Sequence, residues 1–148
     1  MTDTQPAKPV YEPIPSELLT SMQRLRTQLG ELISSEFPGK SLTGTPGDFT
    51  LLQDVVDAQI LADSDIKAWE AMGIVFGDAL SIEIPGLSWV QVTDEYGVDP
   101  VLRYQETTVQ IGVATMLLKR VEQGEEINIK HMVHWLQAFI ETRAHEYQ

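Results

Sequence analysis

The segment GLSWVQVTDEYGVDPVLRYQ, residues 86–105, decides the predicted fold because its apolar residues are spaced differently from those elsewhere in the chain. Elsewhere apolar residues recur every three or four positions, which is typical of amphipathic helices. Here they alternate, with Leu87 and Trp89 on one side and Ser88 and Val90 on the other. The alternation resumes after the DEYG turn and reaches TTVQI. This pattern predicts a short antiparallel β-meander.

Helical patterns flank the meander on both sides. Ser, Asp or Asn precede them, and proline or glycine follows them, as helix cap and stop signals do. The predicted helices cover residues 17–37, a short segment from 48, a segment from 63 or 64 to 84, a segment from 112 or 113 to 123, and a last helix after 128. Three helices precede the meander and two follow it, without strand–helix alternation, so we predict a mainly helical α+β fold.

The chain has 148 residues, a length that suggests one domain. Residues 1–15 contain four prolines and few apolar side chains, so we expect a flexible N-terminal arm there and a single globular domain over 16–148. The absence of cysteine excludes disulfides and thiolate metal sites. No signal-peptide core and no bilayer-length apolar stretch is visible, which predicts a cytoplasmic protein without membrane contact.

The formal net charge is −12, and the excess is concentrated in the middle of the chain. Residues 61–110 hold nine acids and two bases. Such a field repels a phosphate backbone, so we predict no nucleic-acid partner. It attracts a basic protein and accelerates the encounter. The alternative is that the acidity only keeps the protein soluble.

The acidic turn of the meander is the first candidate site. The candidate partner-binding residues are Asp94, Glu95, Tyr96, Asp99 and Arg103. We expect Arg103 to pair across the hairpin with Glu95 or Asp94. The alternative is a plain turn, in which Gly97 supplies a positive φ and an aspartate accepts hydrogen bonds from nearby amides. The segment lacks the spacing of a calcium loop, and no histidine within it would complete a catalytic pair.

Two further groups of residues have spacing that suggests a role. Gly73 and Gly77 are four apart in the third predicted helix, which predicts close packing of another backbone or, alternatively, a substrate contact. His131 and His134 are three apart in the last helix and are candidate metal ligands, with Glu141 as a third. A structural zinc site needs a fourth ligand, which nothing nearby supplies. We therefore predict no metal and no cofactor.

Three segments together resemble a known family. They are AMGIVFGDAL (71–80), GLSWVQVTDEYG (86–97) and LLKRVEQGEEINI (117–129). These segments and their order resemble the uncharacterised bacterial family "domain of unknown function 3806", and the resemblance covers about residues 66–135. That family has no established activity, so the resemblance implies a domain and not a reaction.

The sequence favours a small, acidic, non-catalytic protein-binding module of a bacterial cytosol. One concrete form is an immunity protein whose acidic hairpin covers the basic cleft of a toxin. The first alternative is a small-molecule or peptide binder with a pocket between the helix of Gly73 and Gly77 and the meander. The second is an enzyme that uses Asp or Glu with a metal on His131 and His134. The oligomeric state does not follow from the sequence.

Overall fold

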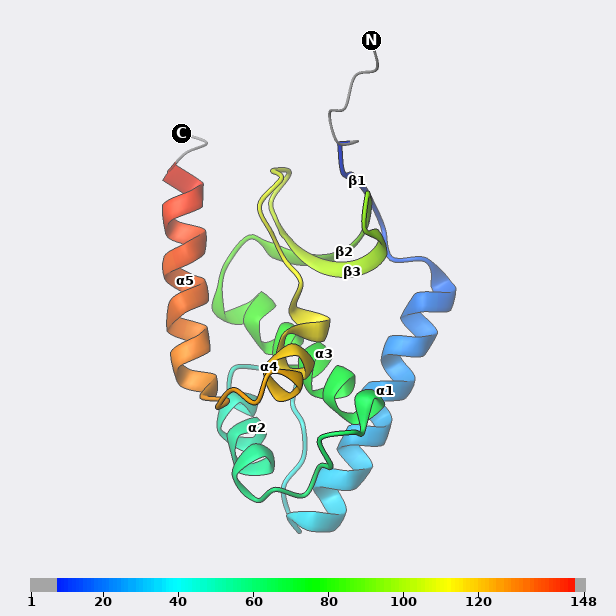
Figure 1. The fold of residues 1–148 in the computed structure, drawn as a ribbon, viewed down its shortest axis with the longest axis vertical. Helices are drawn as coiled ribbons and strands as arrows, with labels where there is room; N and C mark the ends of the chain where they lie inside the picture. The colour runs from blue at the N-terminus through cyan, green and yellow to red at the C-terminus, as the bar shows by residue number, and fades with distance from the viewer. Residues whose placement is uncertain (1–7, 146–148) are drawn as a thin grey trace.

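Helix α3 lies at the centre of the fold in the computed structural model, which describes residues 8–145 (Figure 1). It packs against α1, α2, α4 and the sheet. In chain order the elements are β1 (Val10–Glu12), α1 (Ser16–Glu36), α2 (Asp48–Asp57), α3 (Ile66–Glu83), β2 (Leu87–Asp94), β3 (Gly97–Tyr104), β4 (Gln110–Ile111), the 3-10 turn η1 (Val113–Thr115), α4 (Met116–Glu122) and α5 (Ile129–His145). The predicted mainly helical α+β class is confirmed.

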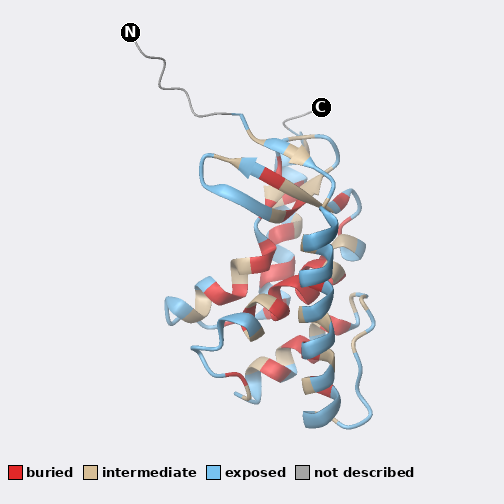
Figure 2. Ribbon diagram, turned by 90° about the vertical axis from the view of Figure 1, so that its right-hand side faces the viewer, coloured by how far each residue is buried: buried red, intermediate tan, exposed pale blue. Residues whose placement is uncertain are grey.

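Helix α3 is central because its sequence is apolar on every side. All seven residues from 71 to 77 are buried, a pattern expected of a helix surrounded by other elements. Its N-terminus is capped by Asp65, whose carboxylate accepts a hydrogen bond from the Ala68 N–H at 3.2 Å. Buried residues concentrate along α3 and on the sides of its neighbours that face it (Figure 2).

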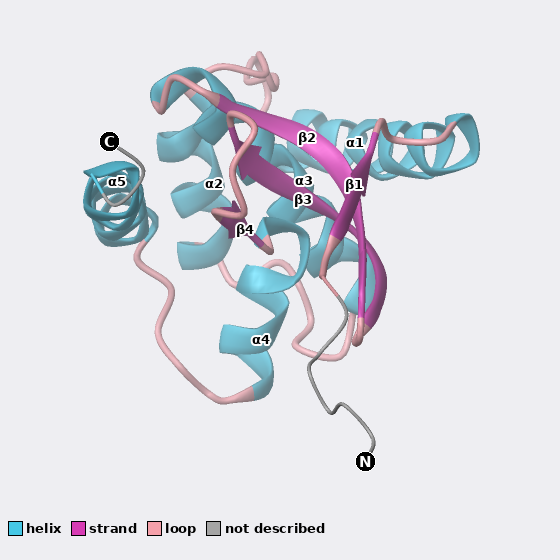
Figure 3. Cartoon of the chain, turned by 90° about the horizontal axis from the view of Figure 1, so that it is seen from above, coloured by secondary structure: helices cyan, strands magenta, loops and turns pink. Residues whose placement is uncertain are grey.

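The predicted meander forms β2, β3 and β4 of an antiparallel sheet with the strand order β1-β2-β3-β4. Strands β2 and β3 pair over their whole length, with Trp89 opposite Leu102 and Asp94 opposite Gly97. The face that carries Leu87 and Leu102 joins the main core with α3. Figure 3 shows the sheet lying across α3.

Strand β1 differs from the predicted flexible arm. Residues 1–7 lie outside the described part of the chain, but Val10–Glu12 pair with β2, with Tyr11 opposite Val92. The Tyr11 hydroxyl donates a hydrogen bond to the Gln110 side chain. The proline content predicted an arm, but the contacts of one aromatic side chain order this segment against the sheet.

Both glycines of α3 lie where another element comes very close. A Cβ atom on Gly73 would lie 2.4 Å from the Ala114 carbonyl oxygen, and one on Gly77 would lie 2.5 Å from the Trp89 ring. These distances are far below a van der Waals contact. The first alternative placed a pocket between α3 and the meander, but at Gly73 and Gly77 that space is filled by η1 and Trp89.

The start of α2 is held by a buried carboxylate. Asp48 is 2% exposed and accepts hydrogen bonds from the N–H groups of Thr43 and Gly44 at 2.9 and 2.8 Å. Its charge is thereby compensated by backbone dipoles in the loop before the helix. The loop is fixed, and with it the position of α2.

Candidate functional site

The β2–β3 turn combines exposed carboxylates with an exposed aromatic ring. Asp94 Oδ1 accepts a hydrogen bond from the Tyr96 N–H at 2.9 Å, and Gly97 has a φ of 122°. The Tyr96 side chain is 85% exposed. A hydrogen bond with Glu95 and the negative charges of Glu95 and Asp94 raise the pKa of the Tyr96 hydroxyl above its usual 10.0.

The predicted pairing of Arg103 with the turn is wrong. The register places Arg103 opposite Ser88, at the other end of the hairpin from Asp94. Its Nε donates to the Thr107 carbonyl oxygen at 2.6 Å, and its guanidinium lies 4.0 Å from the centre of the Tyr11 ring. The guanidinium is held by these contacts of β1 and β3, so Arg103 does not neutralise the acidic turn.

Three carboxylates remain at the end of the hairpin, together with apolar side chains. Within residues 8–145, no lysine or arginine forms a salt bridge with Asp94, Glu95 or Asp99. Val98 is 57% exposed and Val10 52%. Thr93 of β2 is paired with Val10 of β1 on one side and with Val98 of β3 on the other, so the two valines lie on the same face of the sheet. We define Asp94, Glu95, Tyr96, Val98 and Asp99 as the hairpin tip.

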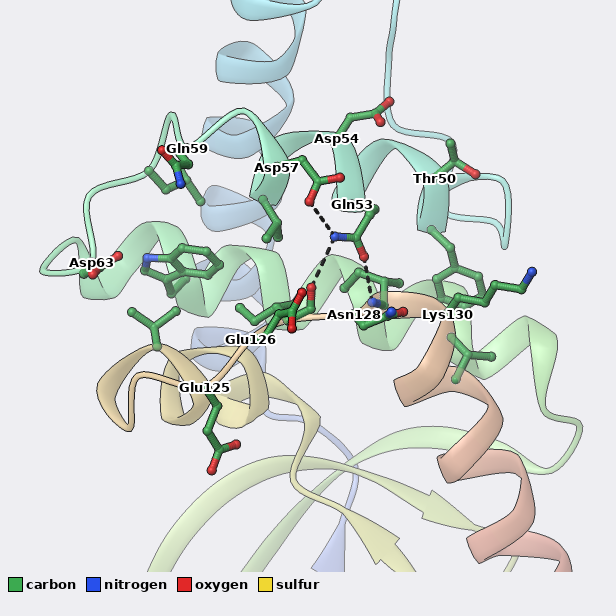
Figure 4. Close-up of a pocket in the computed structure, with 18 of the residues that line it drawn as sticks. Thr50, Gln53, Asp54, Asp57, Gln59, Asp63, Glu125, Glu126, Asn128 and Lys130 are labelled. Carbon is green, nitrogen blue, oxygen red and sulfur yellow. Dashed lines mark hydrogen bonds between the residues drawn. The ribbon is translucent and has the colours of Figure 1, made fainter.

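A second candidate site is a groove of about 1380 Å³ that the sequence did not predict. It runs between α2, the α2–α3 loop, the α4–α5 loop and α5 (Figure 4). Its acidic lining residues are Asp54, Asp57, Asp63, Glu83, Glu125 and Glu126. Of the described lining residues, Lys130 is the single lysine or arginine, and Figure 4 shows its ammonium group pointing away from Asp57 and Glu126. The groove is therefore strongly acidic.

Apolar side chains form the other part of the groove lining. They include Leu61, Trp69, Val121, Ile127, Ile129 and Val133. The Trp69 indole N–H donates to the Ala62 carbonyl oxygen at 3.0 Å, which fixes the ring. An acidic lining over an apolar wall suits a ligand that is both cationic and partly apolar.

The Gln53 side chain spans the groove. Its Nε2 donates to Asp57 Oδ1 at 2.9 Å and to the Ile127 carbonyl oxygen at 3.2 Å, and its Oε1 accepts from the Ile129 N–H at 2.8 Å. Figure 4 shows these bonds linking α2 to the chain that precedes α5. These hydrogen bonds connect the two walls of the groove. On the α5 side they reach backbone groups of Ile127 and Ile129, two buried residues.

We expect Gln53→Ala to lower the free energy of unfolding by about 1 kcal/mol, because the Ile127 carbonyl oxygen and the Ile129 N–H lose their side-chain partner. Urea denaturation followed by circular dichroism measures the change. Gln28→Ala, at an exposed glutamine of α1, is the matched control and should change stability by less than about 0.5 kcal/mol. Equal effects of both substitutions would contradict the role of Gln53.

The candidate metal ligands do not gather into a cluster. His134 lines the groove and His131 is exposed, with its backbone N–H donating to the Asn128 side chain at 3.0 Å. Among residues 8–145, no group of three histidine, aspartate or glutamate side chains is arranged to hold a metal ion. His131 therefore forms part of the start of α5, with Asn128 as its cap.

Sequence reasoning missed the groove because its carboxylates are far apart in the chain. They come from α2, the α2–α3 loop, the end of α3 and the α4–α5 loop, over residues 54–126. The charge count of residues 61–110 includes only Asp63 and Glu83 of this set. No local sequence motif indicates such a site, since its lining residues are brought together by tertiary contacts.

The order of elements and the central buried helix define a mainly helical α+β domain. The chain belongs to the family described as domain of unknown function 3806, whose model matches residues 48–132. This confirms the predicted resemblance, which covered about residues 66–135. No curated protein matches this chain. Within residues 8–145, the helices lack the combination of length and apolar character that crossing a bilayer requires.

The fold also occurs in a solved structure. A crystal structure of a protein from Bacteroides thetaiotaomicron VPI-5482 superimposes with a TM-score of 0.76 at 20% sequence identity. The similarity covers 90% of this chain and 49% of the other, so this chain spans about half the length of that protein. At this identity the likeness establishes a shared fold.

Proposed function

We propose that this protein is a non-catalytic binding module that recognises a basic protein partner through the hairpin tip. The observation that carries the proposal is the exposure of Tyr96, 85%, beside three carboxylates that form no salt bridge within residues 8–145. Tyrosine is enriched at the energetic centres of interfaces, because it combines apolar area with a hydroxyl.

The charge of the protein supports the same proposal. A net charge of −12 steers a basic partner toward the molecule, and the hairpin projects from its body (Figure 1). The exposed Val98 adds apolar area next to the charges, which suits an interface with an apolar centre and a polar rim. An immunity protein that covers the basic cleft of a toxin is one form of this function, in a bacterial cytosol.

Charge reversal at the tip tests the proposal. We expect Asp94→Lys with Glu95→Lys to slow association with the partner about tenfold and to weaken its dependence on salt, because rim charges act mainly on the encounter rate. The partner is first recovered from the native host on immobilised wild-type protein and identified by mass spectrometry. Association and dissociation rates are then measured by surface plasmon resonance with the purified partner.

The matched control reverses two exposed glutamates of α1, Glu31 and Glu36, to lysine. It changes the net charge by the same amount but leaves the hairpin intact, so it should slow association less than the hairpin variant does. If both variants slow association equally, only the overall charge matters and the tip is not the contact surface. If the hairpin variant binds as fast as wild type, the proposal fails.

A further inference from the structure

We infer that the groove between α2 and α5 is a second binding site, which takes an extended basic segment of a polypeptide. The groove is separate from the hairpin tip, since the two sets of residues do not overlap. Figure 1 shows α2 and the β2–β3 turn toward opposite ends of the molecule. The inference therefore does not depend on the proposed function of the tip.

The charge of the groove selects a cation. Six carboxylates and one lysine line it. One of the six, Glu125, pairs with Arg120 at 3.5 Å, which leaves five without a lysine or arginine partner among the described residues. Two of the carboxylates, Asp57 and Glu126, come from opposite walls and lie on either side of Gln53 in Figure 4, while Asp63 lies at one end. Because the acids are spread along the groove, they match a ligand with several separated positive charges better than a single ion.

The size and lining of the groove favour a polypeptide over a small molecule. Its volume of about 1380 Å³ exceeds the roughly 300–1,000 Å³ that is typical of small-molecule pockets. In an extended peptide successive side chains point to opposite sides. Apolar residues of such a peptide can pack on the half-buried Val56 and Val121 while its lysines or arginines reach the acids.

Amide side chains in the groove add a feature that a simple polycation would not use. Gln59, Asn128 and Gln137 line it, and an amide both donates and accepts hydrogen bonds. A peptide backbone presents donors and carbonyl acceptors along its length, whereas a polyamine presents donors alone. The mixture of amides and carboxylates therefore fits a basic peptide.

The test uses a short peptide that alternates lysine and leucine, with spermine and a peptide that alternates glutamate and leucine for comparison. Binding to the full chain is measured by isothermal titration calorimetry at low and at physiological ionic strength. The groove variant combines Asp57→Asn, Asp63→Asn and Glu126→Gln, which removes three charges but keeps the side-chain shapes. We expect it to bind the lysine peptide about tenfold more weakly than wild type does.

The matched control removes three charges from exposed glutamates of α1, with Glu17→Gln, Glu31→Gln and Glu36→Gln. It should bind the lysine peptide within about twofold of wild type, because its groove is intact. A circular dichroism spectrum and a melting curve check that both variants are folded. Saturable binding of the lysine peptide, lost in the groove variant alone, supports the inference.

Three results would overturn it. Equal losses in the groove variant and the α1 control variant would mean that the peptide responds only to net charge. Spermine binding as tight as that of the lysine peptide would assign the groove to small polyamines. If the lysine peptide shows no measurable binding to wild type at low ionic strength, the groove is not a binding site for basic peptides.

Discussion

We expect Gly73→Ala to lower the free energy of unfolding by about 2 kcal/mol, although alanine is the better helix former. The added Cβ would lie 2.4 Å from the Ala114 carbonyl oxygen and 2.7 Å from that of Val113. Both are backbone atoms and cannot rotate away, so η1 must move off α3. Overpacking of this kind costs up to about 3 kcal/mol, and the helix propensity of alanine returns about 1 kcal/mol.

Gly30 in α1 provides a control with the opposite sign. A Cβ at Gly30 meets nothing within 4 Å, so Gly30→Ala should raise the free energy of unfolding by about 0.5–1 kcal/mol through propensity alone. Urea denaturation of both variants and wild type measures the two changes. A Gly73→Ala protein as stable as wild type would show that η1 and α3 do not pack as tightly as the structure has them.

The elements that the sequence predicted are those with local signals. The alternation of residues 86–105 and the turn at Gly97 specify a hairpin whatever surrounds it. The helices have regular apolar spacing with proline or glycine beyond their ends, so their existence was predictable and their limits were correct to within a few residues.

Features that depend on distant contacts were not predictable. Strand β1 exists because Tyr11 packs beside Arg103, more than ninety positions away in the chain. The predicted ion pair failed for a different reason, since the hairpin register places Arg103 opposite Ser88, at the other end from Asp94. The groove also depends on distant contacts, since Gln53 forms hydrogen bonds with Ile127 and Ile129, 74 and 76 positions away in the chain.

The carboxylate of Asp78 is the second position where we expect a large effect. It accepts hydrogen bonds from Arg26 Nε at 2.7 Å, from Arg26 Nη2 at 2.9 Å and from the Trp89 indole N–H at 3.0 Å. It thus connects α1, α3 and β2 at one point. The two charged side chains are only 24% and 20% exposed, so water screens their attraction less than at an open surface.

We expect Asp78→Ala to lower the free energy of unfolding by about 2–3 kcal/mol, because Nε and Nη2 of Arg26 and the Trp89 indole N–H lose their acceptor in a half-buried place. Glu125→Ala is the control, since its pair with Arg120 is 3.5 Å long and 38–50% exposed, and should cost less than about 1 kcal/mol. Trp89 gives a second readout. The fluorescence of Asp78→Ala should become easier to quench with acrylamide, because the indole is released. Unchanged quenching together with unchanged stability would show that the contact between Arg26, Asp78 and Trp89 does not hold the sheet on α3.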